Sequence, residues 1–129
     1  MTPKVLIVQE PFLLSEIYKG KLKALGIEGD IAEGFDEAAE KLANEIFNLV
    51  LLDTLMDRVK GKIRGFELLQ RLRAHKDLRV ASTPVVMLSD LSLREHIEKG
   101  LHLGANEYMI KTQHSPNEVV LRIKKMIYV

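Results

Sequence analysis

The sequence of 129 residues has no cysteine and no tryptophan, and aromatic residues make up only 5% of it. The lack of cysteine excludes disulfides, thiolate metal sites and cysteine nucleophiles. No apolar run approaches the roughly 20 residues that a membrane helix needs, and the N-terminal segment lacks the longer apolar run of a signal peptide. We therefore predict a cytoplasmic protein that does not bind membranes.

An excess of charge of either sign is also absent. Nineteen Lys and Arg residues against 18 Asp and Glu residues give a net charge of +1. Bulk charge therefore disfavours direct binding to nucleic acid or to a membrane surface. The sequence also lacks a glycine-rich phosphate loop and an HExxH motif, which argues against a nucleotide site.

What is present is the composition of a folded globular domain, with 47% apolar and 29% charged residues. At roughly 150 residues per domain, the length predicts one domain over residues 1–129. Four short runs are rich in β-branched residues and do not alternate with polar ones, which predicts strands buried on both faces of a parallel sheet. The predicted strands are residues 5–8, 49–52, 85–88 and 108–110, with a weaker edge strand at 28–32.

Apolar residues at helical spacing follow each predicted strand. The five stripes are Leu14, Ile17, Tyr18, Leu22 and Leu25; Ala39, Leu42 and Ile46; Phe66, Leu69 and Leu72; Leu93, Ile97 and Leu101; and Val119, Val120, Ile123, Met126 and Ile127. We expect Asp36 to cap the second helix and Ser92 to cap the fourth. Strand and helix alternating five times predict an α/β fold, a doubly wound parallel sheet with helices on both faces.

Polar side chains follow the strands at the edge where open parallel sheets bind ligands. They are Gln9 with Glu10, then Asp53, then Ser89 with Asp90, and finally Lys111. Two carboxylates with a carbonyl oxygen suit Mg²⁺, and a carboxylate can attack phosphorus. A lysine and a hydroxyl can hold the oxygens of a transferring phosphoryl group. The pattern predicts a site that receives a phosphoryl group on a side chain.

The segments KVLIVQE, LVLLDTLM, GFELLQRLR, TPVVMLSD and LGANEYMIKT resemble those of the response-regulator receiver domains of two-component signalling. The likeness extends over essentially the whole chain. It implies a flavodoxin-like fold, in which a five-stranded parallel sheet of order 2-1-3-4-5 is flanked by five helices.

The resemblance implies a role for the residues at the strand ends. Asp53 would be the phosphoacceptor, Lys111 would pair with the phosphoryl group, and Ser89 would bond one of its oxygens. Tyr108 would be a switch that turns inward when Ser89 moves. The alternative for Tyr108 is simple packing with its hydroxyl in water.

The same resemblance implies that Mg²⁺ is the cofactor. Its ligands would be the carboxylates of Glu10 and Asp53, the backbone carbonyl of Leu55 and, through a water molecule, Gln9. Because Gln9 stands where the family usually has an acid, we expect weaker Mg²⁺ binding and not its loss.

Further departures from the family pattern lie near the site. Asp57 and Thr112 stand where the family usually has proline, and Asp90 stands where it prefers a small residue. A cis peptide costs about 3–4 kcal/mol without proline, so we expect a trans Lys111–Thr112 bond and a differently placed Lys111. The loop that leads into the third helix is either a solvated loop or a basic lip for an acidic partner or the phosphodonor, and its basic residues are Arg58, Lys60, Lys62 and Arg64.

The interpretation that we favour is a phosphoacceptor receiver, a signalling protein and not an enzyme. A histidine kinase or phosphotransfer protein would donate the phosphoryl group. A downstream protein would bind the face of the fourth helix, fifth strand and fifth helix, and homodimer formation stays open. The alternative is a degenerate pseudo-receiver, a phosphorylation-independent interaction module, for which Gln9, Asp90 and Thr112 count. A third hypothesis, a small phosphatase with Asp53 as nucleophile, has only Asp57 as a candidate general acid.

Overall fold

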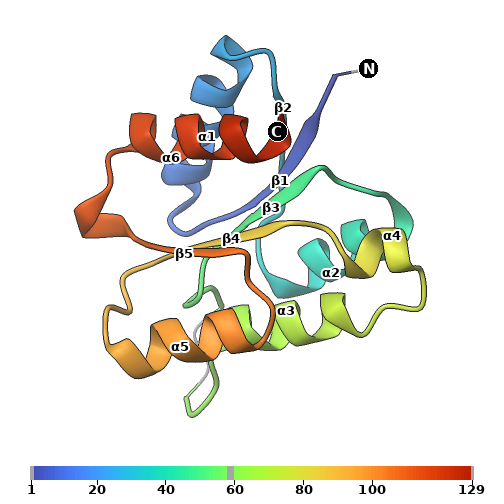
Figure 1. Ribbon diagram of the computed structural model, residues 1–129, viewed down its shortest axis with the longest axis vertical. Coiled ribbons are helices and arrows are strands. Elements are labelled where there is room, and N and C mark those ends of the chain that lie inside the picture. The colour runs from blue at the N-terminus through green and yellow to red at the C-terminus, as the bar shows by residue number, and fades with distance from the viewer. Residues whose placement is uncertain (1, 58–59, 129) are drawn as a thin grey trace.

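Five parallel strands form the centre of the computed structural model, which describes residues 2–57 and 60–128 (Figure 1). They are β1 (Lys4–Val8), β2 (Glu28–Ile31), β3 (Leu49–Leu52), β4 (Val85–Ser89) and β5 (Glu107–Ile110), and they lie in the order β2-β1-β3-β4-β5. The predicted fold class and strand order are confirmed. Val8 pairs with Leu52, and Ser89 pairs with Ile110. The ends of these strands therefore emerge together at one edge of the sheet, the carboxyl edge.

Six α-helices lie within the described residues, one more than the sequence pattern predicts. They are α1 (Phe12–Ala24), α2 (Phe35–Asn44), α3 (Arg64–Arg73), α4 (Leu78–Ala81), α5 (Arg94–His102) and α6 (Pro116–Ile127). The unpredicted helix, α4, is a single turn that buries only Val80, so it has no apolar period to detect. None of the described helices combines the length and the apolar character that crossing a membrane requires.

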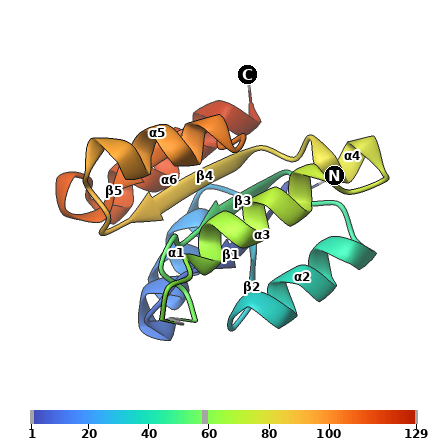
Figure 2. The same cartoon turned by 90° about the horizontal axis from the view of Figure 1, so that it is seen from below.

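The sheet separates two apolar cores, and Figures 1 and 2 show the helices that cover its two faces. Helices α1 and α6 cover one face, where Tyr18 and Ile123 pack among strand residues such as Ile7. Helices α2 and α3 cover the other face, where Phe66 packs in the core that includes Leu6. Neighbouring strand residues point to opposite faces. Both faces are apolar, which explains why the buried strands β1, β3 and β4 read as continuous apolar runs.

Two helix starts differ from the predicted ones. The N-cap of α2 is Gly34, and Asp36 lies in the first turn. The N-cap of α5 is Leu93, which makes no side-chain capping bond, so Ser92 does not cap it. The first N–H of α2, that of Phe35, is instead paired with a carboxylate 22 residues away in sequence. Local sequence cannot indicate a partner at that separation, and the prediction for Asp36 was therefore wrong.

Several residues predicted to face inward are exposed, namely Ile17, Ile46, Leu93 and Leu101. Ile46 lies beyond α2, because the chain becomes extended at Glu45. Helix α5 meets the sheet through Gly100, where a Cβ atom would lie only 2.9 Å from Cδ2 of Tyr108. Since this glycine takes the inward position, the following residue, Leu101, is turned toward solvent.

The edge of the sheet opposite the carboxyl edge is held by Arg73, the last residue of α3. Its guanidinium donates hydrogen bonds to the carbonyls of Ala81 at 2.8 Å, Thr83 at 2.7 Å and Gly104 at 2.7 Å, and to Oδ1 of Asn106 at 3.1 Å. Burial lowers the pKa of Arg73, but a guanidinium stays charged in proteins. One side chain thereby joins α3 to the segments that enter β4 and β5.

Candidate functional site

Asp53 directly follows β3 and is almost fully buried, with 3% of the residue exposed. Its Oδ2 accepts hydrogen bonds from the backbone N–H of Glu10 at 3.1 Å and from Nζ of Lys111 at 3.0 Å. Its Oδ1 accepts a hydrogen bond from the N–H of Leu55 at 3.0 Å. A buried carboxylate needs such partners to remain charged. The structure thus brings together Asp53, Lys111 and the backbone of Glu10 and Leu55.

Lys111 begins a short 3-10 helix, Lys111–Gln113, directly after β5. The Lys111–Thr112 peptide is trans, as predicted, whereas the Glu10–Pro11 peptide is cis. The prediction that a trans bond displaces Lys111 was wrong, because its ammonium reaches Asp53 and also donates to the carbonyl of Glu10 at 3.2 Å. The lysine therefore bonds to residues that follow two different strands, β1 and β3.

Ser89 is the last residue of β4 and is fully buried. Its Oγ accepts a hydrogen bond from the N–H of Leu91 at 3.0 Å, and the carbonyl of Leu91 accepts one from the hydroxyl of Tyr108 at 2.8 Å. The ring of Tyr108 packs against Gly100 of α5. A series of two hydrogen bonds therefore leads from the carboxyl edge to β5, and the hydroxyl of Tyr108 is bonded to protein.

Gln9 is buried next to Glu10, and neither Oε1 nor Nε2 of its amide has a hydrogen-bond partner within the protein. A buried amide without partners costs about 1–3 kcal/mol, so this group is suited to bind a polar ligand. No cluster of three or more His, Cys, Asp or Glu side chains that could hold a metal occurs in the described parts of the chain. The available donors are the carboxylates of Glu10 and Asp53, the Gln9 amide and backbone carbonyls. This oxygen set fits Mg²⁺, which uses one or two carboxylates and keeps several waters.

Asp57 is a further residue of this edge, and its contacts were not predicted. Its backbone N–H donates a hydrogen bond to Oε1 of Glu10 at 2.9 Å, and its Oδ2 accepts one from the N–H of Phe35. The side chain of the predicted metal ligand Glu10 is therefore bonded to the segment that follows β3. The only feature of the sequence that pointed to an unusual role for this position was an aspartate, Asp57, in place of the proline that is usual in the family.

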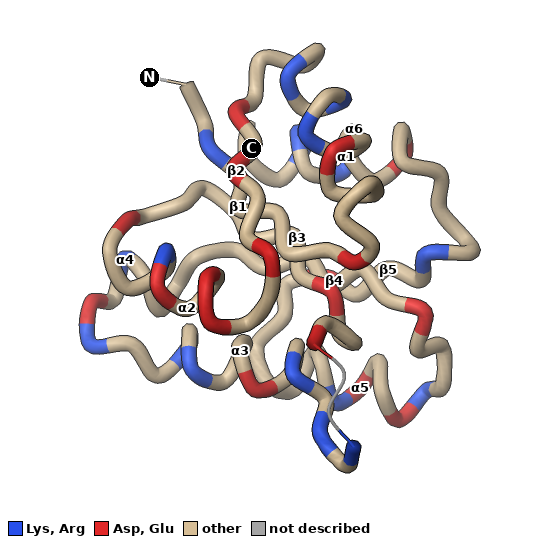
Figure 3. The backbone as a smooth tube through the Cα atoms, turned by 180° about the vertical axis from the view of Figure 1, so that it is seen from behind, with Lys and Arg blue, Asp and Glu red and all other residues tan. Residues whose placement is uncertain are grey.

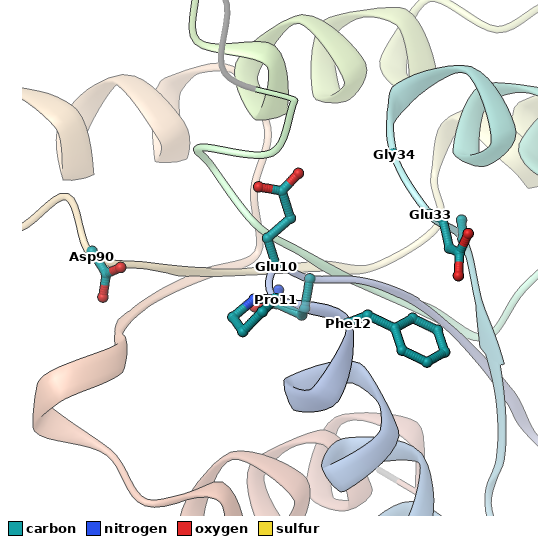
Figure 4. A pocket seen from close by; sticks show the side chains of 8 residues that line it. Glu10, Pro11, Phe12, Glu33, Gly34 and Asp90 are labelled. Atoms are coloured by element: carbon teal, nitrogen blue, oxygen red, sulfur yellow. The ribbon is translucent and has the colours of Figure 1, made fainter.

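A hollow of about 660 Å³ opens beside the site, and its lining includes Gln9, Glu10, Phe12, Glu33 and Asp90. Figure 4 shows the carboxylates of Glu10, Glu33 and Asp90 on three separate segments around it. Figure 3 shows acidic segments of several loops at the same edge of the molecule. The negative lining favours a cation over an anion.

The loop for which the sequence leaves a solvated loop and a basic lip as alternatives is described only in part, because Arg58 lies outside the described residues. Lys60 and Lys62 are exposed to solvent. Arg64 is the first residue of α3, and its guanidinium carbon lies 4.0 Å from the centroid of the Phe35 ring. Arg64 therefore packs against α2 by a cation–π contact, so it belongs to the fold and not to a solvated lip.

The family model of the response regulator receiver domain matches residues 5–124. The phosphate regulon transcriptional regulatory protein PhoB of Rhizobium meliloti is 31% identical over 127 residues, which are 98% of this chain and 53% of that protein. The transcriptional regulatory protein CrdR of Helicobacter pylori is 33% identical over 125 residues, 97% of this chain and 55% of that protein. The chain belongs to the receiver domain family of two-component response regulators, and it spans about half the length of these relatives.

Solved structures agree with this assignment. The receiver domain of the Francisella response regulator 1452 superposes with a TM-score of 0.83 at 26% identity, covering 98% of both chains. A CheY-like receiver domain protein from Methanospirillum hungatei also gives a TM-score of 0.83, at 29% identity over 99% of this chain and 95% of that one. The resemblance inferred from the sequence segments is therefore confirmed at the level of family and fold.

Proposed function

We propose that the chain accepts a phosphoryl group on Asp53 in a Mg²⁺-dependent reaction and signals through protein–protein contacts. The observation that carries this proposal is the Asp53 carboxylate, buried at the end of β3 and bonded to the ammonium of Lys111 at 3.0 Å. Ser89 lies at the end of the adjacent strand, β4. A nucleophile, a cation and a hydroxyl thus share the carboxyl edge.

In the proposed reaction, an oxygen of the Asp53 carboxylate forms a new bond to phosphorus. The bond between phosphorus and the donor atom breaks, and the donor keeps its electron pair. The ammonium of Lys111 offsets the negative charge of the phosphoryl oxygens, and the hydroxyl of Ser89 donates a hydrogen bond to one of them. The N–H of Leu55, which already donates to Oδ1, fixes the orientation of the carboxylate.

Glu10, Asp53, the carbonyl of Leu55 and, through a water molecule, Gln9 would hold the magnesium ion. The ion supplies positive charge that stabilises the phosphoryl oxygens during transfer. Because the amide of Gln9 is neutral, two carboxylates provide the negative charge of the site. This supports the prediction that Mg²⁺ binding is weaker than with a third acid.

Ser89 would transmit the modification to the surface. If its Oγ turns toward a phosphoryl oxygen, it releases the N–H of Leu91, and the carbonyl of Leu91 is the acceptor of the Tyr108 hydroxyl. A shift of this segment changes the face of α5, β5 and α6, which correspond to the fourth helix, fifth strand and fifth helix of the predicted fold. Leu93, the N-cap of α5, and Leu101, within α5, are exposed, and they are the apolar contacts proposed for a downstream protein.

A histidine kinase or phosphotransfer protein is the proposed phosphodonor. PhoB and CrdR are transcriptional regulators by name, but this chain corresponds to about half of each, so control of transcription is not carried over. Two statements stay predictions from the sequence, namely a single domain over residues 1–129 and a cytoplasmic location. Whether the chain forms a homodimer stays open.

The proposal is tested by incubating the chain with acetyl phosphate and Mg²⁺ and measuring its intact mass. We expect one added phosphoryl group in the wild type and none in Asp53→Asn. Asp90→Asn removes an exposed carboxylate from the same edge and should still be modified. An unmodified wild type, under conditions that label an ordinary receiver, would contradict the proposal and favour the pseudo-receiver.

A further inference from the structure

Asp57 links the predicted cation site to the first turn of α2, and we infer that it is a positioning residue for Glu10. The inference rests on the proposed function, because it concerns the same site. The N–H of Asp57 holds Oε1 of Glu10 at 2.9 Å, while the carboxylate of Asp57 accepts the hydrogen bond of the Phe35 N–H. One residue thus fixes a metal ligand with its backbone and anchors itself with its side chain.

The backbone of Asp57 needs this anchor. Its φ of +46° lies in the left-handed region, which residues other than glycine rarely adopt and which costs of order 1–3 kcal/mol. The N–H groups in the first turn of a helix have no partner within the helix and attract negative charge. The bond from Phe35 to the Asp57 carboxylate therefore stabilises the conformation in which the Asp57 N–H points at Glu10. Proline at this position could form neither contact, because it has no N–H and its φ stays near −65°.

Gly34 makes the anchor sterically accessible. Its φ is +120°, and a Cβ atom built there would lie 2.6 Å from Oδ2 of Asp57. Any larger residue would displace the carboxylate from the N–H of Phe35. Arg64 meets the same Phe35 through its ring, at 4.0 Å. The two residues that flank the loop before α3, Asp57 and Arg64, therefore both contact Phe35.

The consequence for the site is that Glu10 is oriented before a cation arrives. The bond from Asp57 occupies one lone-pair site of Oε1 of Glu10, and the remaining sites of the carboxylate are left for the cation. Hydrogen-bond partners that orient a ligating group typically account for a factor of 10–100 in metal affinity. The anchor on α2 should therefore be visible in the affinity of the site for a divalent cation, although Phe35 and Gly34 hold no cation themselves.

The test measures Mn²⁺ affinity of the full chain by electron paramagnetic resonance, with Mg²⁺ as competitor. Asp57→Gly keeps the N–H but removes the carboxylate, and a glycine without this anchor is free to adopt conformations in which its N–H leaves Glu10. Gly34→Ala displaces the carboxylate without changing any charge, and it also strains the backbone, because φ is +120° at this position. Both should bind Mn²⁺ about tenfold more weakly or worse. Asp57→Asn retains an acceptor for Phe35 and should stay within about threefold of the wild type. The control Asp36→Asn, which removes an exposed carboxylate next to Phe35, should bind as the wild type does.

Two results would overturn the inference. Wild-type affinity in Asp57→Gly would show that the anchor does not position Glu10. An equal loss in Asp57→Asn and Asp57→Gly would show that only the negative charge matters. If Gly34→Ala does not fold, as judged by thermal unfolding without metal, the two Asp57 variants decide alone. A wild type that binds no Mn²⁺ would contradict the proposed metal site itself. This outcome is distinguishable from a failure of the positioning role of Asp57, because it is seen before any variant is compared.

Discussion

The amide of Gln9 is buried, its two polar atoms have no hydrogen-bond partner among the described residues, and Gln9 lines the same hollow as Glu10. We predict that Gln9→Asp has opposite effects with and without metal. A third carboxylate should tighten Mg²⁺ binding, on the order of tenfold, because it adds negative charge close to the ion. Without metal, the same change should lower the free energy of unfolding, since like charges are then buried together. Calorimetric Mg²⁺ titration and urea unfolding with and without Mg²⁺ measure both effects.

Gln9→Met is the matched control, because it keeps the shape of the side chain and removes its polar atoms. Without metal, it should raise the free energy of unfolding by about 1 kcal/mol, since no unpaired amide is then buried. Its affinity for Mg²⁺ should not exceed that of the wild type. Unchanged Mg²⁺ affinity in Gln9→Asp would mean that this side chain does not face the cation.

The sequence allowed the meeting of Asp53 and Lys111 at the carboxyl edge to be predicted, but not all of the contacts of the candidate site. Asp53 and Lys111 were recognisable because each follows an apolar strand, and parallel strands bring their ends to one edge. Asp57 was not, because its partner Phe35 is 22 residues away and the contact depends on Gly34 at a positive φ. Such a contact arises from the packing of two loops, which leaves no periodic pattern in the sequence.

Helix α6 begins with a complete capping box. Ser115 accepts a hydrogen bond from the N–H of Glu118, and the side chain of Glu118 accepts one from the N–H of Ser115. The bond from Ser115, followed by the contact with His114, lowers the pKa of Glu118. Ser115→Ala should lower the free energy of unfolding by about 1 kcal/mol, because the N–H of Glu118 loses its acceptor, the Ser115 hydroxyl. Urea unfolding near neutral pH measures this loss.

Ser92→Ala is the control for this prediction. The sequence alone gives Ser92 the same capping role, but in the structure Leu93 occupies the N-cap of α5 and Ser92 is exposed. Its substitution should change the free energy of unfolding by less than about 0.5 kcal/mol. Equal losses in Ser115→Ala and Ser92→Ala would contradict the assignment of the two helix starts. The two variants therefore distinguish a serine that caps a helix, Ser115, from a serine that only has the residue type suited to capping, Ser92.

At the level of elements, strands were easier to predict than helix ends. The central strands β1, β3 and β4 are buried on both faces, so their residues are constrained on every side and read as apolar runs, whereas β2 and β5 are partly exposed. Helix ends depend on single contacts, such as that of Asp57 at the start of α2, and on close approaches, such as that of Gly100 to Tyr108. These contacts come from other parts of the chain, and for that reason Asp36, Ser92 and Leu101 were assigned wrongly.

The stability of the whole molecule should fall at alkaline pH because of Tyr18, which is buried between α1 and the sheet. Burial raises the pKa of Tyr18 to about 12, since the tyrosinate would lose its hydration. In the unfolded chain the pKa of tyrosine is about 10. The contribution of neutral Tyr18 to the free energy of unfolding is therefore complete below about pH 10 and is lost as the pH rises toward 12. The loss is roughly 2–3 kcal/mol.

Tyr18→Phe removes the titrating hydroxyl and should flatten the decline in the free energy of unfolding over this pH range. Urea unfolding between about pH 9 and pH 12 measures the difference from the wild type. Tyr128→Phe is the matched control, because Tyr128 is 56% exposed, and its decline should follow that of the wild type. Parallel curves for the wild type and Tyr18→Phe would show that Tyr18 does not couple folding to pH.

The hydrogen bonds of Arg73 make the two ends of the sheet mechanically unequal. The guanidinium of Arg73 joins α3 to the segment that enters β4 and to the segment that enters β5. Shifting any of these three breaks hydrogen bonds to a charged donor, each worth about 1.5–3 kcal/mol. At the other end, the ammonium of Lys111 also acts as a charged donor, to Asp53 and to the carbonyl of Glu10. Ser89 and Tyr108, by contrast, are each joined to the Leu91 segment by a single neutral bond. The Leu91 segment is therefore the part of the carboxyl edge that the weakest of these bonds hold. If Asp53 is modified as proposed, we expect the displacement to concentrate in this segment.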